Sequence, residues 1–152
     1  MKKFLLMLFV FVSVISFGSW EKVYQKDDFG DKTNQYMIGT LFRESNTAAV
    51  LVGYHEKTKQ TAIVINFLGA DFGPEKNIEI RVKGDDGEIS PTPIGLVSGS
   101  YIVIRPEYAD KIISALKKSK ILKFNINGYK FSISASGFTK AYENATKNNF
   151  RD

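Results

Sequence analysis

The sequence predicts a mainly β protein, an antiparallel β-sandwich or partly open barrel of about seven to nine strands with two short C-terminal helices. Short β-rich segments recur every 8 to 15 residues from Gln35 onward, a spacing typical of sandwiches and barrels. The segments between them are rich in Gly, Asp, Asn and Ser, which favour turns. Asn127-Gly128 separates two alternating segments and predicts a two-residue hairpin turn.

The first 18 of the 152 residues have the pattern of a secretory signal peptide. Lys2 and Lys3 precede a segment from Phe4 to Phe17 in which twelve of fourteen residues are apolar, and Ser16 and Gly18 are small. A positive start, a short apolar run and small residues before the cut are the features of a cleaved leader. We therefore expect cleavage after Gly18 and export to the periplasm or the exterior. The alternative, a retained N-terminal anchor, stays open.

After the leader at 1–18, we expect a polar arm over 19–34, one domain over 35–148 and a frayed tail over 149–152. The arm holds at most one short strand. No window after the leader is long and apolar enough to span a membrane as a helix. A chain of this length can bury roughly two thirds of the surface that it exposes when unfolded, so the fold needs no metal or disulfide.

The predicted strands follow one another along the first two thirds of the domain. Their β-branched and aromatic residues favour half-buried, pleated surfaces. The predicted strands cover QYMIGTLF (35–42), TAAVLVGYH (47–55), TAIVINF (61–67), NIEIRVK (77–83) and YIVIR (101–105).

The hairpin ILKFNI-NG-YKFSIS is the strongest local signal. A type I′ turn at Asn127-Gly128 fixes the register of the two strands. It places one set of residues on a core face and the other on a solvent face. The predicted core-face set is Leu122, Phe124 and Ile126 opposite Ile133, Phe131 and Tyr129, and the solvent-face set is Lys123, Asn125, Lys130 and Ser132.

Two helices are predicted on either side of this hairpin. The first begins at Pro106-Glu107, with an apolar stripe of Tyr108, Ile112, Ala115 and Leu116. The second begins after Ser136-Gly137, with a stripe of Phe138, Ala141, Tyr142 and Ala145.

The composition excludes several classes of chemistry. The chain has no cysteine and one histidine, so disulfides, thiolate metal sites, cysteine nucleophiles and multi-histidine metal sites are absent. The lone His55 is expected to be a solvated turn residue. Two Asp-Phe-Gly triplets, 28–30 and 71–73, lack the other kinase motifs, and no phosphate-binding loop occurs. The residues indicate no cofactor.

Acidic residues leave two alternatives open. Asp27, Asp28 and Asp31 form one cluster, and Asp85, Asp86 and Glu88 form another. Neither matches the alternation of a calcium loop, so we expect turns and no metal site. An envelope hydrolase using two carboxylates drawn from Asp71, Glu75, Glu79 and Glu107 stays open, because sequence does not place any two at the separation that glycoside cleavage needs.

The charge of the chain is unevenly distributed. Residues 19–110 contain ten Lys or Arg and fourteen Asp or Glu, whereas residues 111–152 contain nine and two. We expect a basic patch that could bind anionic glycans, lipid headgroups or an acidic partner. The alternative is that these lysines protect an edge hairpin from pairing with other chains and maintain solubility. The patch residues are Lys117, Lys118, Lys120, Lys123 and Lys130. Nucleic acid is not an expected partner, because the hairpin aromatics alternate onto the core face.

The arrangement from about Met37 to Ala145 resembles small periplasmic β-sandwich proteins of Gram-negative bacteria, of the invasion-associated locus B type and the type VI secretion accessory type. The resemblance is carried by Tyr108–Leu116, by the hairpin Phe124–Ile133 and by the closing segment Ser136-Gly137-Phe138-Thr139-Lys140-Ala141. It implies an exported, non-enzymatic domain and transfers no functional residue. Together with the leader and the missing catalytic motifs, it favours an exported binding or accessory module whose partner is an envelope protein or an anionic surface polymer.

Overall fold

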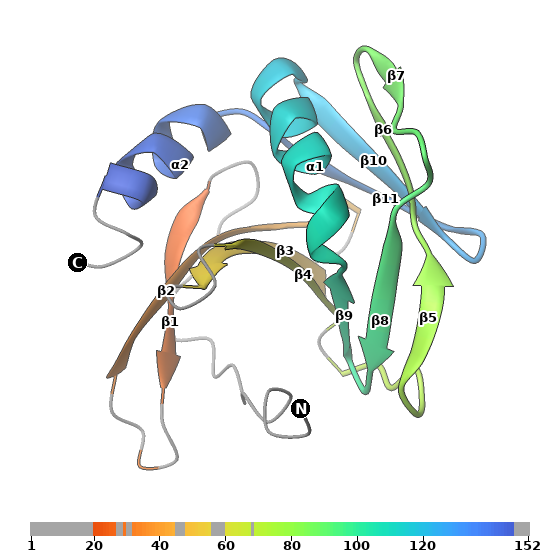
Figure 1. The fold of residues 1–152 in the computed structure, drawn as a ribbon, viewed down its shortest axis with the longest axis horizontal. Coiled ribbons are helices and arrows are strands. Elements are labelled where there is room, and N and C mark those ends of the chain that lie inside the picture. The colour runs from red at the N-terminus through yellow and green to blue at the C-terminus, as the bar shows by residue number, and fades with distance from the viewer. Residues whose placement is uncertain are drawn as a thin grey trace.

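In the computed structural model the chain folds into two antiparallel sheets and two helices (Figure 1). The structure describes residues 20–26, 29, 32–44, 48–55, 60–67 and 69–147. The larger sheet has seven strands and the smaller has four. Both sheets end in edge strands, so neither closes into a barrel. The predicted mainly β, sandwich-like class is confirmed.

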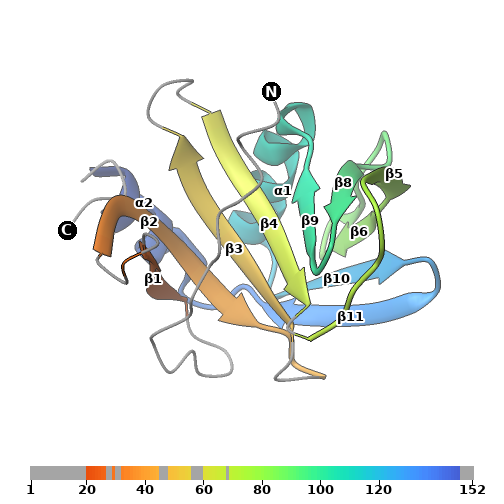
Figure 2. The ribbon, with the colours of Figure 1, turned by 90° about the horizontal axis from the view of Figure 1, so that it is seen from below.

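The seven-stranded sheet has the order β1-β2-β3-β4-β9-β8-β5. Its first four strands follow the chain order, and β9, β8 and β5 continue it on the far side of β4; Figure 2 shows β3 and β4 side by side at its centre. The strands are β1 (Glu21–Lys26), β2 (Lys32–Leu41), β3 (Ala48–His55), β4 (Gln60–Phe67), β5 (Lys76–Glu79), β8 (Ile94–Ser98) and β9 (Tyr101–Ile104).

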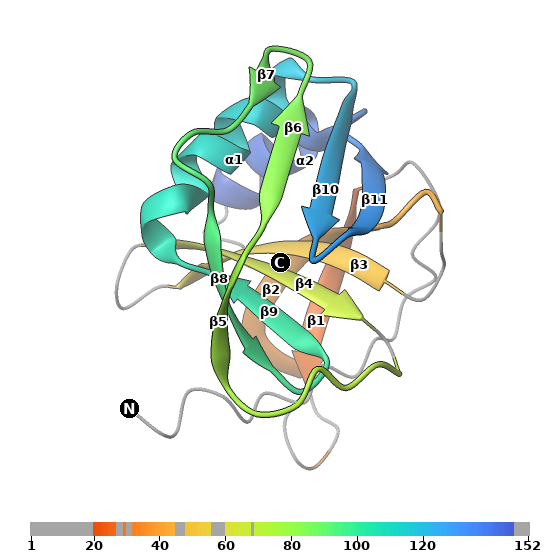
Figure 3. The same ribbon diagram turned by 90° about the vertical axis from the view of Figure 1, so that its right-hand side faces the viewer.

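The four-stranded sheet has the order β11-β10-β6-β7. It joins the C-terminal hairpin to a short hairpin from the middle of the chain, and Figure 3 shows β6 and β10 running side by side. The strands are β6 (Arg81–Gly84), β7 (Gly87–Glu88), β10 (Ile121–Ile126) and β11 (Tyr129–Ser134).

The described residues form eleven strands, more than the expected seven to nine. One reason is that the predicted strand 77–83 divides at Ile80 into β5, which belongs to the larger sheet, and β6, which belongs to the smaller. Strands that switch sheets in this way form the corners of packed sheets. The other reason is that β1, β7 and β8 lie outside the segments of the predicted strands. Strand β1 lies in the arm at 19–34, where the sequence predicts at most one short strand.

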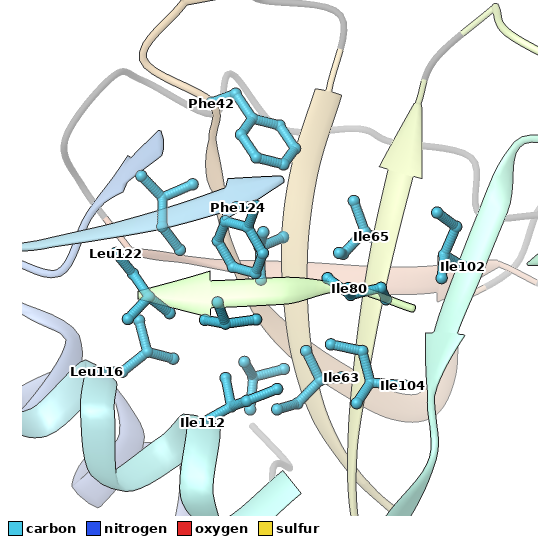
Figure 4. Packing of buried hydrophobic residues seen from close by; sticks show 14 of the residues in the cluster. Phe42, Ile63, Ile65, Ile80, Ile102, Ile104, Ile112, Leu116, Leu122 and Phe124 are labelled. Atoms are coloured by element: carbon cyan, nitrogen blue, oxygen red, sulfur yellow. The ribbon is translucent and has the colours of Figure 1, made fainter. Parts of the chain in front are cut away.

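The main core lies between the two sheets and the helix α1 (Pro106–Lys118). Figure 4 shows Ile112 and Leu116 of α1 with Ile63 of β4 and Leu122 of β10. All four side chains are less than 2% exposed, and burying an aliphatic side chain of this size contributes roughly 1.5–3 kcal/mol. A smaller cluster of Met37, Leu51 and Val64 lies on the opposite face of the larger sheet.

Both predicted helices are confirmed. Helix α1 begins at Pro106, and its buried residues include Ile112 and Leu116 of the predicted stripe. The helix α2 (Phe138–Lys147) buries Phe138 and Ala145. The ring of Trp20 packs edge-on against Phe138, with the ring centroids 4.7 Å apart. Because the Trp20 indole also donates a hydrogen bond to the Ser134 carbonyl (3.0 Å), the start of the described chain is joined to its C-terminal elements.

The hairpin turn also forms as predicted. Asn127 and Gly128 have φ angles of +51° and +88°, and the type I′ turn requires positive values at both positions. The register pairs Leu122 with Ile133 and Phe124 with Phe131. The predicted burial of Tyr129 is wrong, since its side chain is 67% exposed. Tyr129 lies beside the turn, where the hairpin extends to the periphery of the molecule (Figures 1 and 2).

Several expectations concern residues outside the described part of the chain. These are the leader at 1–18, the acidic cluster of Asp27, Asp28 and Asp31, and the tail at 149–152. His55 is the last residue of β3, in agreement with its predicted place at a strand end. Within the described residues, no helix has the length and apolar character needed to cross a membrane.

Candidate anion-binding groove

The outer face of the four-stranded sheet is polar and mainly cationic. Alternation along β10 and β6 turns Phe124 and Val82 into the core and leaves Lys123, Lys83 and Arg81 exposed. Successive side chains of a strand point to opposite faces, so the same sequence pattern that builds the core also builds this face. The predicted solvent face of the hairpin is confirmed for Lys123 and Lys130, whereas Asn125 is half-buried and the prediction is wrong for Ser132, which is buried. Strand β6 extends this face.

A groove with a volume of about 440 Å³ runs over this face. Five cationic side chains and two carboxylates line it, together with polar and aromatic residues of the hairpin. The lining residues are Arg43, Glu44, Arg81, Lys83, Glu88, Lys123, Phe124, Asn125, Lys130, Phe131 and Ser132.

Two of the lysines that line the groove, Lys83 and Lys123, stand directly opposite each other. The pairing of β6 with β10 places Lys83 beside Lys123, and Arg81 lies beside Asn125 in the same ladder. The pairing of β10 with β11 then places Lys130 on the other side of Asn125. Like charges directly opposite in an antiparallel pair destabilise the sheet. This arrangement therefore favours a bound anion between the lysines.

The two groove carboxylates are already engaged by the protein. Glu88 accepts two hydrogen bonds from Arg81, at 2.6 Å to Nε and 2.8 Å to Nη2. The hydrogen bond from the Arg81 side chain holds the pKa of Glu88 below its ordinary value. Lys83 stands opposite Glu88 in the pairing of β6 with β7, and its charge also helps to lower the pKa of Glu88. Within the described residues, no carboxylate forms an ion pair with Lys123 or Lys130.

Glu44 lies at the opposite end of the groove, in the turn after β2. Its carboxylate accepts hydrogen bonds from the backbone N–H (2.7 Å) and the hydroxyl of Ser132. Partial burial acts to raise the pKa of Glu44, but the hydrogen bonds from Ser132 outweigh it and hold the pKa below the ordinary value. Ser132, predicted on the solvent face, is 5% exposed. Both groove carboxylates are thus stabilised in the ionised form.

The five lysines of the predicted basic patch lie in three places. Lys123 and Lys130 line the groove. Lys117 lies on α1, with its Nζ 4.9 Å from the centre of the Tyr142 ring, and Lys118 borders a smaller pocket beside α1. Lys120 precedes β10, and its backbone N–H donates to Asp85 (3.0 Å). The structure therefore brings together two of the five lysines.

Sequence reasoning missed the cations Arg43, Arg81 and Lys83. The alternation of NIEIRVK placed Arg81 and Lys83 on one face of a strand, which was the available signal. It did not show which strand lies next to them, because β6 and β10 are about 40 residues apart in the sequence. Arg43 reaches the groove through a turn, where its N–H donates to the Ser132 carbonyl (2.8 Å).

The four carboxylates considered for a hydrolase are all exposed, and two of them, Asp71 and Glu75, lie in the loop between β4 and β5. Asp71 accepts a hydrogen bond from the Gly73 N–H (2.8 Å) and forms a loop turn. Glu79 is in β5, and Glu107 is in the first turn of α1, 4.0 Å from Arg105.

In the second acidic cluster, the Asp85 carboxylate accepts a hydrogen bond from the backbone N–H of Lys120. Within the described residues, no three His, Asp or Glu side chains gather as metal ligands would.

Comparison of the chain with models of known protein families, with curated proteins and with solved structures finds no match.

Proposed function

We propose that the chain is an exported, non-catalytic binding module of the cell envelope, and that it binds an anionic ligand in the groove of the four-stranded sheet. The direct opposition of Lys83 and Lys123 is the observation that carries this proposal. A ligand carboxylate, sulfate or phosphate between them relieves the repulsion of two like charges. Lys130 of β11, and Arg43, whose N–H donates to the Ser132 carbonyl of β11, extend the positive region on the β11 side.

The state of the two groove carboxylates supports binding over hydrolysis. A general acid needs a pKa raised towards neutrality, which burial or a second carboxylate supplies. Glu44 and Glu88 have lowered pKa values and accept hydrogen bonds from Ser132 and Arg81. Glu88 holds the Arg81 side chain in position, and Glu44 attaches its turn to Ser132 at the border of the groove.

A binding titration with dextran sulfate tests the proposal. The double variant Lys83→Gln/Lys123→Gln should bind roughly tenfold more weakly at low salt, because two exposed charge contacts contribute about 1–2 kcal/mol together. The dependence of affinity on salt should also become shallower, since fewer charges are screened.

Two control variants make the titration specific to the groove. Lys76→Gln/Lys140→Gln removes the same charge from exposed positions outside the groove and should leave the affinity within about twofold of the native value. Lys117→Gln/Lys118→Gln/Lys120→Gln removes the part of the predicted patch that lies off the groove. An equal loss in the groove variant and in the Lys76/Lys140 control would show attraction by net charge alone and would contradict the proposed site.

A further inference from the structure

Tyr129 is an exposed aromatic side chain next to Lys130 in the sequence, although Tyr129 itself does not line the groove. It is the first residue of β11, and its pairing with Ile126 is the last before the turn. Its exposure of 67% is high for a large aromatic side chain in a folded domain. Tyrosine is enriched at binding interfaces, because it combines a large apolar ring with a polar hydroxyl group.

The Tyr129 ring is held in place by the residues beneath it. It stacks on Phe131, with the planes 14° apart and the centroids separated by 6.4 Å. Phe131 in turn packs against Phe42 and Phe67, at centroid distances of 4.8 and 5.3 Å. One face of the Tyr129 ring is therefore supported by the core. The side chain is nevertheless 67% exposed. Because Phe131 restricts its motion beforehand, Tyr129 loses less conformational freedom when a ligand binds.

The turn adds to this rigidity. The Asn125 side-chain oxygen accepts a hydrogen bond from the Gly128 N–H (3.0 Å), which ties the turn to a residue of the groove. Positive φ at Asn127 and Gly128 lets the chain reverse in two residues. Tyr129 is thus presented on a well-defined hairpin end.

The aromatic ring and the groove are adjacent along the strand. Lys130 lines the groove and follows Tyr129 directly, so the two residues are separated by about 3.3 Å along β11. Their side chains point to opposite faces of the sheet. The hairpin end lies at the periphery of the molecule (Figures 1 and 2). A ligand that contacts both residues has to be long enough to leave the groove at Lys130 and pass around the turn to Tyr129.

These features together define the chemistry of the ligand. The groove supplies positive charge, and the ring supplies an electron-rich face. A pyranose ring carries C–H groups on its faces that fit such an aromatic surface, whereas an isolated phosphate or sulfate group does not. We propose that the ligand is an acidic polysaccharide whose charged groups bind Lys83, Lys123 and Lys130 and one of whose sugar rings stacks on Tyr129. This inference rests on the proposed function.

A single-stranded nucleic acid would combine charge and stacking in a similar way. Surfaces that bind such strands present successive aromatic rings to successive bases. On the same face of the hairpin, Phe124 is 2% exposed and Phe131 is covered on one side by Tyr129. The single open ring of Tyr129 therefore favours a sugar chain.

The test compares two polyanions with the full chain. Polygalacturonate carries carboxylates on sugar rings, and poly-glutamate carries carboxylates without rings. Tyr129→Ala should weaken polygalacturonate binding by about fivefold or more and change poly-glutamate binding by less than about twofold. Tyr129→Phe keeps the ring and should retain the native affinity. Thermal unfolding of each variant checks that the fold is intact, which the exposure of Tyr129 favours.

The outcomes separate this inference from the proposed function. If Tyr129→Ala affects both polymers equally or affects neither, or if the native chain does not bind polygalacturonate, the assignment of an acidic polysaccharide is overturned. A larger Tyr129→Ala effect on a single-stranded DNA oligonucleotide also overturns it, in favour of nucleic acid. If instead Lys83→Gln/Lys123→Gln leaves the binding of both polymers unchanged, the groove is not the site and the proposed function fails.

Discussion

The carboxylate of Glu44 binds Ser132, a residue 88 positions later in the chain, through both its backbone N–H and its hydroxyl. The neighbouring Arg43 N–H donates to the Ser132 carbonyl (2.8 Å). Together these contacts satisfy the backbone N–H and carbonyl of Ser132 at the edge of β11, and they attach the turn after β2 to the smaller sheet. A free β edge is a template for pairing with other chains. The Glu44–Ser132 contact therefore both joins the two sheets and protects an edge strand.

The first prediction concerns Glu44→Gln. Replacing the carboxylate weakens charge-assisted hydrogen bonds, and for this exposed group we expect a loss of about 1 kcal/mol or less in the free energy of unfolding at pH 7. Urea unfolding of the native chain and the variant measures it. Glu143→Gln, an exposed change on α2, serves as the control and should have little effect.

The pH dependence of this contact follows from the lowered pKa of Glu44. A carboxyl group with a lowered pKa in the folded state stabilises the fold fully above its unfolded pKa. That contribution is lost as the pH falls through the folded pKa. The difference between native and Glu44→Gln should therefore be greatest near neutral pH and shrink below about pH 4. A difference that grows on acidification would contradict the contact.

The second prediction tests the hairpin turn. Gly128 has a φ of +88°, a conformation in which a β-branched residue is strongly disfavoured. Gly128→Val should lower the free energy of unfolding by more than about 1 kcal/mol. Gly128→Asn is the matched variant, because Asn tolerates positive φ, and it should cost less. A loss below roughly 0.3 kcal/mol for the valine variant would show that the turn is of another type.

The third prediction concerns the packing of Gly95 in β8. A Cβ atom at this position would lie 2.5 Å from Cγ2 of Ile102 and 2.7 Å from Cδ1 of Ile80. Both isoleucines are fully buried, so the core has to shift to admit a methyl group. Gly95→Ala should therefore destabilise the fold by about 1–3 kcal/mol. Ser98→Ala introduces alanine in the same strand without adding a Cβ atom, and it should have a much smaller effect on urea unfolding.

The features predicted correctly from the sequence are those that depend on residues close together in the chain. The turn at Asn127-Gly128 and the start of α1 at Pro106 depend on neighbours in the sequence, and both are where the pattern placed them. The division of 77–83 at Ile80 depends on two sheets that meet there, and local alternation contains no sign of it. Tyr129 has the correct register, but its exposure depends on how far the facing sheet extends.

The candidate site shows the same limit. Composition located a surplus of positive charge in the C-terminal residues, and two of its lysines, Lys123 and Lys130, line the groove. The partners that complete the groove, Arg81 and Lys83, come from a segment whose net charge is negative. Charge counted along the chain cannot reveal a cluster assembled by pairing between distant strands. Strand pairing, and with it Lys83 opposite Lys123, became visible with the fold.

The last prediction concerns the processing of the N-terminus. The leader pattern predicts cleavage after Gly18, which leaves Trp20 as the second residue of the mature chain. Trp20 is 8% exposed, packs on Phe138 and donates to the Ser134 carbonyl, so cleavage beyond Trp20 would remove a core contact. Mass spectrometry of the protein from its native host should therefore find a chain that begins at or near Ser19.

Unfolding of Trp20→Ala provides an independent test of that boundary. Removing this ring should cost about 3 kcal/mol or more, as expected for a buried aromatic side chain. A mature chain that starts after Trp20 would contradict the role of this residue in the fold. Recovery of intact Met1-Lys2-Lys3 on most of the protein would instead reject cleavage and favour the retained anchor. Only the start near Ser19 agrees with both the leader pattern and the burial of Trp20.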